Sequence, residues 1–180
     1  MNMRDCFYEQ GVRKYNAAVE TIMYYLAIVA AVGMGLLALM MLTAMMAAGI
    51  TPQAVIMTLV PAACAVLLVL FRGRLRVEYD YTFTNGEMDF SVIYNGMKRR
   101  ELGSVKLQEA EAVGKVAGAA FQRYVSMPGL VQHRWFLNRG AELYYVYAQK
   151  EGTRHLYVFE PDEEMVQSMK SFIPAGVMQE

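Results

Sequence analysis

The pattern of apolar and polar side chains divides the chain into three parts. Residues 21–71 contain no Lys, Arg, Asp, Glu or His, and about 20 apolar residues are enough to cross a bilayer. This stretch is therefore long enough to cross a membrane twice. A turn former, a helix breaker and polar side chains meet only at residues 49–53. The sequence predicts a transmembrane hairpin of helices 21–48 and 53–71, preceded by an N-terminal arm of residues 1–20.

Strict alternation begins at residue 75 and predicts a half-buried antiparallel strand over residues 75–84. Its apolar positions are Leu75, Val77, Tyr79, Tyr81 and Phe83. Asn85-Gly86 follows, and this pair favours a type I′ hairpin turn because both central residues need positive φ. We expect a return strand over residues 87–94, a turn at Asn95-Gly96 and a third strand over residues 98–107. These strands form a meander.

The rest of the chain predicts further short strands and one helix. Short apolar segments lie at residues 112–116 and 120–125, a loop is expected at 127–132, and strands at 133–137, 142–149 and 155–159. Pro161 and the acidic residues after it then open a helix. The apolar positions of its buried face are Met165, Val166, Met169, Phe172 and Ile173. About seven strands and a C-terminal helix result, with the many tyrosines expected in the core or in strand pairing.

Two segments carry a resemblance to the PH-like domains that bacteria attach to membrane hairpins. The first resembles their opening meander and reads LRVEYDYTFTNGEMDFSVIYNGMKRRELGSVKL; the second resembles their closing strand and helix and reads FEPDEEMVQSMKSFIP. From end to end, the chain resembles a small uncharacterised family of two-span membrane proteins from Gram-positive bacteria. The resemblance implies an α+β membrane protein in which a helical hairpin precedes a cytoplasmic PH-like antiparallel β-barrel or sandwich, residues 75–180, with a C-terminal helix. It implies no activity, because the family has none assigned.

The residues that flank the apolar stretch predict its orientation. Arg13 and Lys14 precede the first span, arginines follow the second, and the connecting turn carries no charge. The positive-inside rule then predicts a multi-pass protein of the cell membrane with both termini in the cytoplasm. A cleaved signal peptide is the alternative, but its apolar region would be about twice the usual length and the leader contains acidic residues.

Charge composition narrows the partners of the protein. The chain has 17 Lys and Arg against 17 Asp and Glu, with a pI near 6.7, so it lacks the basic footprint of a nucleic-acid-binding protein. Six basic residues are candidates for contact with lipid or a protein partner: Arg72, Arg74, Arg76, Lys98, Arg99 and Arg100. The alternative is that they form ordinary solvated flanks. PH-like domains that bind phosphoinositides do so with basic residues on the loop between the first two strands. Here that loop is the Asn85-Gly86 turn, which has no cation to bind a phosphate.

The candidate chemistry is sparse. His133 and His155 are the only histidines, Cys6 and Cys64 are expected to be unpaired thiols, and no nucleophile, phosphate-binding, dinucleotide or zinc motif occurs. Core or edge positions account for both histidines better than metal binding or general-base catalysis does. We expect no catalytic residue, no metal and no cofactor, and therefore no enzyme.

Small residues at Ala27, Ala31 and Gly35 share one face of the first helix. Such a face lets two helices approach closely in lipid. It serves either to pack the hairpin on itself or to bind a second copy or a partner membrane protein.

The function that these features favour is a membrane-anchored binding or scaffolding module. Its partners are the lipid bilayer and an unidentified protein, and an open sheet edge beside the C-terminal helix is a candidate for binding a strand by β-augmentation. The alternative is an accessory subunit of a larger membrane complex, held through its transmembrane hairpin.

Overall fold

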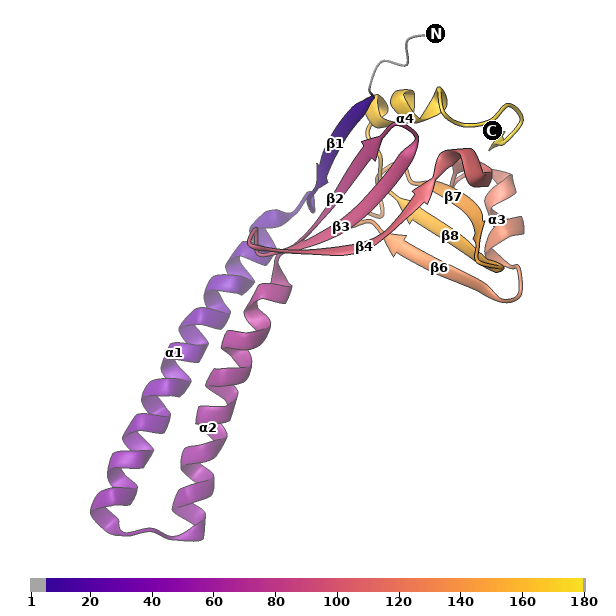
Figure 1. Cartoon of the computed structure of the whole chain (residues 1–180). Coiled ribbons are helices and arrows are strands. Elements are labelled where there is room, and N and C mark those ends of the chain that lie inside the picture. The colour runs from indigo at the N-terminus through magenta and orange to yellow at the C-terminus, as the bar shows by residue number, and fades with distance from the viewer. Residues whose placement is uncertain (1–5, 180) are drawn as a thin grey trace. The chain divides into compact units, whose positions relative to one another are not determined.

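The computed structural model describes residues 6–179 (Figure 1). The chain divides into two compact units. The helical unit comprises Asn16–Val77 and Tyr94–Gly96, and the β unit comprises most of the remaining residues.

The helical unit is a hairpin of two long helices. The first, α1, spans Ala17–Ala48, the second, α2, spans Pro52–Phe71, and a 3-10 turn at Arg72–Leu75 follows. Thr51 caps α2 by accepting a hydrogen bond from the backbone N–H of Ala54 at 3.2 Å, and Pro52 suits the first turn because that turn needs no donor. The predicted hairpin is present, with α1 starting four residues before the expected position.

Both helices are apolar and largely exposed. The most apolar 18-residue windows of Ala17–Ala48 and Pro52–Leu75 have mean hydropathies of 2.4 and 2.7, and 11% and 6% of these windows are buried. By length and composition each helix is able to cross a membrane. Ala31 is buried, as is Pro61 of α2, and Ala27 and Gly35 are half-buried. A Cβ added at Gly35 would meet nothing within 4 Å, so the role of the small-residue face in helix packing stays a prediction.

The first sheet of the β unit has the order β1-β2-β3-β4. Its strands are β1 Phe7–Val12, β2 Val77–Thr84, β3 Glu87–Tyr94 and β4 Lys98–Lys106. Asn85 and Gly86 both have positive φ, 49° and 96°, as the predicted hairpin turn requires. The meander β2-β3-β4 is confirmed, and β2 begins two residues later than expected because Leu75 ends the 3-10 turn and Arg76 follows that turn as its cap.

Strand β1 extends this sheet and was not predicted. Phe7 pairs with Thr84, and Val12 pairs with Tyr79, in an antiparallel register. Part of the arm of residues 1–20 is therefore a strand of the β unit, while residues 1–5 of that arm lie outside the described residues. The side-chain hydroxyl of Tyr8 donates to a carboxylate oxygen of Asp162 at 2.7 Å. This contact ties β1 to the segment before the C-terminal helix.

The second sheet has the order β6-β8-β7-β5-β9. Its strands are β5 Ala110–Lys115, β6 Leu130–Trp135, β7 Tyr144–Lys150, β8 Thr153–Phe159 and β9 Met178–Gln179; the connections include η2 Leu107–Glu109 and the helix α3 Ala119–Val125. The pairs β5·β9 and β6·β8 are parallel, so the expectation of an all-antiparallel domain is wrong. The expected loop at residues 127–132 is also wrong in part, because β6 begins at Leu130.

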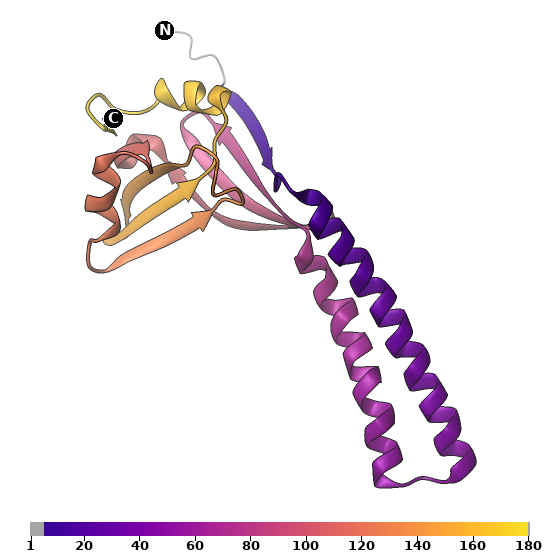
Figure 2. The ribbon, with the colours of Figure 1, turned by 180° about the vertical axis from the view of Figure 1, so that it is seen from behind.

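The two sheets face each other and enclose the main core (Figure 1 and Figure 2). Helix α4, Glu163–Lys170, contributes its predicted apolar face to this core and is capped by Asp162. The buried core side chains include Tyr81, Phe83, Phe90, Trp135, Val146, Phe159, Met165 and Met169. No closed barrel forms, because among the described strands no pairing joins the two sheets. The barrel part of the predicted fold class is therefore corrected to an open two-sheet arrangement.

Candidate functional site

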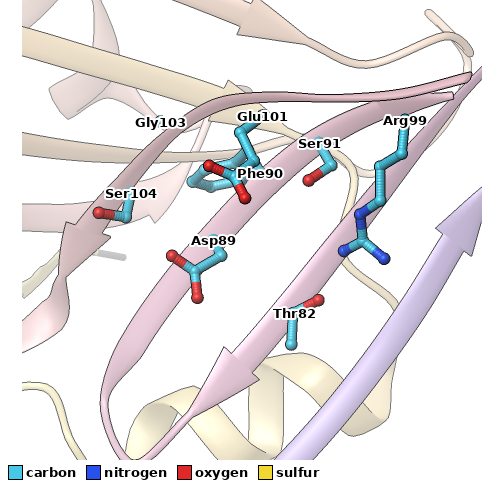
Figure 3. A pocket seen from close by; sticks show the side chains of 8 residues that line it. All are labelled: Thr82, Asp89, Phe90, Ser91, Arg99, Glu101, Gly103 and Ser104. Carbon is cyan, nitrogen blue, oxygen red and sulfur yellow. The ribbon is translucent and has the colours of Figure 1, made fainter.

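Two clefts flank β4, the last strand of the first sheet. The first, which we call the outer cleft, has a volume of about 360 Å³ and opens on the polar face of β2, β3 and β4 (Figure 3). Its lining residues are Thr82, Asp89, Phe90, Ser91, Arg99, Glu101, Gly103 and Ser104. Alternation explains this polar surface, because Asp89 and Ser91 are two residues apart and so share one face of β3, opposite the core residue Phe90.

Arg99 is held by acidic neighbours at this surface. Its guanidinium lies 2.9 Å from a carboxylate oxygen of Asp80 and 3.8 Å from one of Glu9. Burial raises the pKa of the Asp80 carboxyl; the charge of Arg99 counteracts this rise, and that of Glu9 adds to it. Arg99, Lys98 and Arg100 are all exposed, but of the three only Arg99 forms an ion pair among the described residues, with the buried Asp80 and with Glu9.

The other predicted basic residues belong to the helical unit. Arg76 donates a hydrogen bond to the Thr21 hydroxyl at 2.8 Å and lies 5.0 Å from the centre of the Tyr24 ring. The Arg74 guanidinium lies 4.9 Å from the centre of the Phe71 ring. Arg72 is half-buried. These contacts hold Arg74 and Arg76 against the end of the hairpin, and contact of the six basic residues with lipid stays a prediction.

Two carboxylates of the outer cleft lack an ion pair among the described residues. The side chains of Asp89 and Glu101 extend into the same space in Figure 3. Burial raises the pKa of the Asp89 carboxyl, and the negative charges of Glu87 and Glu101 raise it further, whereas Arg99 lowers it. Beside them, Ser91 is only 3% exposed, and its hydroxyl, which points into the cleft (Figure 3), has no hydrogen-bond partner among the described residues. This combination of oxygen atoms favours a cation.

The second cleft, the inner cleft, has a volume of about 450 Å³ and lies between β4 and the strands β6 and β8. On the β4 side it is lined by Leu102, Gly103 and Ser104; on the other side it is lined by His133, Trp135, His155 and Tyr157, with Lys150, Glu151 and Thr153 of the β7–β8 turn. The side that faces β4 is therefore largely made of aromatic and imidazole rings.

The two histidines stack within this cleft. Nε2 of His133 lies 3.0 Å from Nδ1 of His155, and the ring planes are 6° apart. Burial lowers the pKa of the His133 imidazole, and the neighbouring His155 lowers it further. His133 also stacks on Tyr157, with ring centres 4.8 Å apart. The expectation of two separate core or edge histidines missed this pair, because strands β6 and β8 bring together residues that are 22 positions apart.

The pair has no acidic partner in the described part of the chain. Glu151 lines the same cleft, but no hydrogen bond or ion pair joins it to either imidazole. Within residues 6–179 there is also no group of three His, Cys, Asp or Glu side chains that could hold a metal ion. The rings that line the inner cleft suit binding of an apolar or aromatic group.

Hydrogen bonds join β1 to the segment before the C-terminal helix, and the expected groove between that helix and a sheet edge stays a prediction. The edge of the first sheet nearest α4 is β1, and Gln10 of β1 contacts the segment before α4 through both atoms of its amide group. Its Nε2 donates to the Glu160 carbonyl at 3.0 Å, and its Oε1 accepts from the Asp162 backbone N–H at 2.9 Å. The open edge strand β4 has the outer cleft on one side and the inner cleft on the other.

The β unit is a domain of two facing sheets with a C-terminal helix, and two apolar helices are inserted in the chain between β1 and β2. The family model described as Bacterial PH-like domain (DUF6106) matches residues 4–179. The chain therefore belongs to this bacterial PH-like family, as the sequence motifs indicated, and the match covers the helices as well as the β domain. No curated protein and no solved structure matches the chain.

Proposed function

We propose that the protein is a membrane-anchored binding or scaffolding module whose β domain captures a protein partner. The observation that carries this proposal is the pair of open clefts along β4. They offer unpaired carboxylates on one side and a surface of rings on the other, next to a strand edge whose backbone groups are free to pair.

The two helices supply the anchor. Their apolar side chains are exposed along both helices, and exposed apolar surface of this extent is stabilised by lipid rather than by water. Basic residues on both flanks support an orientation with both termini in the cytoplasm. A cysteine at Gln53, in a variant whose Cys6 and Cys64 are replaced by serine, should react with an impermeant thiol reagent only from the outside.

Exchange of the hairpin tests the binding proposal. Residues 16–76 are replaced by an unrelated two-span anchor, and partners are compared by crosslinking in native membranes. If the β domain is the binding module, the exchanged chain keeps the same partner. Loss of the partner with a folded β domain would contradict the proposal and favour an accessory subunit held through its hairpin.

A further inference from the structure

A gap lies between β4 and β6, and these two edge strands do not pair with each other. Each of these strands is the last of its sheet, and residues of both line the inner cleft. At one end of the cleft the sheets are bridged, because the Tyr81 hydroxyl of β2 donates to the Trp135 carbonyl of β6. At the other end the cleft reaches the β7–β8 turn. A strand added to the free edge of β4 would lie in this gap.

We propose that an extended segment of a partner protein, with basic residues alternating with apolar or aromatic residues, binds in this gap as that strand. The inference rests on the proposed function and names the chemistry of the partner. Successive side chains of a strand point to opposite faces. A strand beside β4 would therefore direct one set of side chains to the outer cleft and the other set to the inner cleft.

The outer cleft selects the basic set. Asp89 and Glu101 have no ion-pair partner among the described residues, and the 3%-exposed Ser91 has a hydroxyl with no hydrogen bond in the same part of the chain. A Lys or Arg side chain supplies both the positive charge and the hydrogen-bond donors that these oxygens lack. A lipid phosphate or a nucleic acid would bring negative charge next to two carboxylates, so neither suits this cleft.

The inner cleft selects the apolar set. Trp135 and Tyr157 form part of its wall with their rings 5.6 Å apart, and the stacked imidazoles extend this surface toward the β7–β8 turn. Gly103 of β4 has a φ of 151°, and a Cβ added there would lie 3.5 Å from the Trp135 ring. The backbone of β4 thus passes close to the ring wall. Aromatic and aliphatic side chains fit such a surface, with offset or edge contacts between rings.

A defined probe peptide tests the inference. The full chain is placed in nanodiscs of zwitterionic phosphatidylcholine, which does not attract basic peptides, and a fluorescein-labelled nine-residue peptide of alternating lysine and phenylalanine or valine is titrated by anisotropy. We expect it to bind at least about tenfold more tightly than a peptide of the same composition without alternation, a difference of about 1.4 kcal/mol. The same peptide with glutamate in place of lysine should not bind. Equal binding of the alternating and scrambled peptides would overturn the inference.

Matched variants test whether the basic side chains of the peptide bind in the outer cleft. Asp89→Asn combined with Glu101→Gln should weaken the alternating peptide by at least about tenfold, and Glu111→Gln, which removes an exposed carboxylate of β5, should leave the affinity unchanged. The fluorescence of Trp135, the only tryptophan, reports whether each variant is folded. An equal effect of the control and the double variant would show nonspecific charge attraction and would refute the outer-cleft assignment.

Hydrogen exchange locates the strand itself. The peptide should slow amide exchange in β4 and β6 and leave the edge strand β1 unchanged, because strand pairing protects the amides that it bonds. N-methylation of every second peptide amide should weaken binding, whether the odd-numbered or the even-numbered amides are methylated. A strand between two edges donates alternate amides to each edge, so either set is needed. Binding without protection of β4 and β6 would refute the inference. If no probe binds while the hairpin exchange keeps its partner, the inference is wrong and the proposed function stands.

Discussion

Arg99 and Asp80 form an ion pair on the polar face of the first sheet. Asp80 has a side chain that is only 7% exposed, Arg99 is 49% exposed, and their charged atoms are 2.9 Å apart. Exposed ion pairs contribute about 0.2–1 kcal/mol, whereas removing one partner of a buried pair costs about 3–5 kcal/mol. A pair with one buried and one half-exposed member lies between these limits. We therefore expect a coupling free energy of about 1–2 kcal/mol between the two side chains at neutral pH.

A double-mutant cycle of Arg99→Gln and Asp80→Asn measures this coupling. Urea unfolding of the full chain in detergent micelles is followed by the fluorescence of Trp135, the only tryptophan, which lies in the core of the β unit. Arg99→Gln alone should lower the free energy of unfolding, because it leaves the buried Asp80 carboxylate without its cation. In the Asp80→Asn background the same substitution should cost much less.

The pH dependence of the cycle follows from the pKa of Asp80. Burial raises this pKa, and Arg99 opposes the rise, so Arg99→Gln raises the pKa of Asp80 further. The cost of the substitution is therefore greatest where Asp80 is ionised, and it shrinks as the pH falls through the raised pKa and the carboxyl becomes neutral. A coupling below about 0.5 kcal/mol at neutral pH, or a coupling that is the same at all pH values, would refute this reasoning.

Three further predictions use the same unfolding assay. Asn138→Ala should lower the free energy of unfolding by about 2–4 kcal/mol. The buried Asn138 amide donates to the Arg13 carbonyl and to Glu160, and it accepts from the Tyr15 N–H. A loss below about 1 kcal/mol would contradict this prediction. Gly114→Ala should lower the free energy of unfolding by about 1–3 kcal/mol and displace β9, because the new Cβ would lie 2.7 Å from the Gln179 carbonyl oxygen. An unchanged free energy of unfolding would contradict this prediction and show that β9 moves freely. Burial and the neighbouring His155 lower the pKa of His133 in the folded chain. As the pH falls, the unfolded chain therefore takes up a proton at His133 before the folded chain does, and the free energy of unfolding should fall as the pH drops through about 6.5. His133→Gln should flatten this pH dependence, and an unaltered dependence would mean that other groups cause it.

Local signals in the sequence were sufficient for much of the fold. The uncharged stretch and its interruption predicted the helical hairpin, because a long apolar run has few alternative structures. Asn85-Gly86 and strict alternation predicted β2 and β3 closely, since turn type and period two act between neighbours in the chain. The same holds for α4, whose cap at Asp162 and apolar face lie within one short segment.

Long-range pairing was the part that local signals could not supply. Strand β1 is formed by a segment with no regular alternation, and it is held by β2 and by contacts of Gln10 with residues about 150 positions away. Strand β9 has two residues, too few for any periodicity. The parallel pair β6·β8 depends on which edges meet after the chain has folded, and no pattern within β6 or β8 records that choice.

The candidate site was predicted only in its components. Arg99 was recognised as one member of a basic cluster, but its ion pair with Asp80 depends on the packing of β2 against the other strands of the sheet. His133 and His155 were noted singly, and their stacking required the register of β6 and β8. The outer cleft depends on the packing of β2, β3 and β4 in one sheet, and the inner cleft depends on how β4 lies against the second sheet. Neither is a property of a single segment.

Site-specific photo-crosslinking in native membranes tests the central claim most directly. A photoreactive residue is placed at Ser104, which lines both clefts, at Glu111 on β5 as the control, or at Leu36 on the exposed side of α1. The account predicts a discrete protein adduct from position 104 that disappears when Asp89→Asn and Glu101→Gln are added, and no such adduct from position 111. Adducts that form only from position 36 would contradict it, because the hairpin and not the open edge of β4 would then hold the partner.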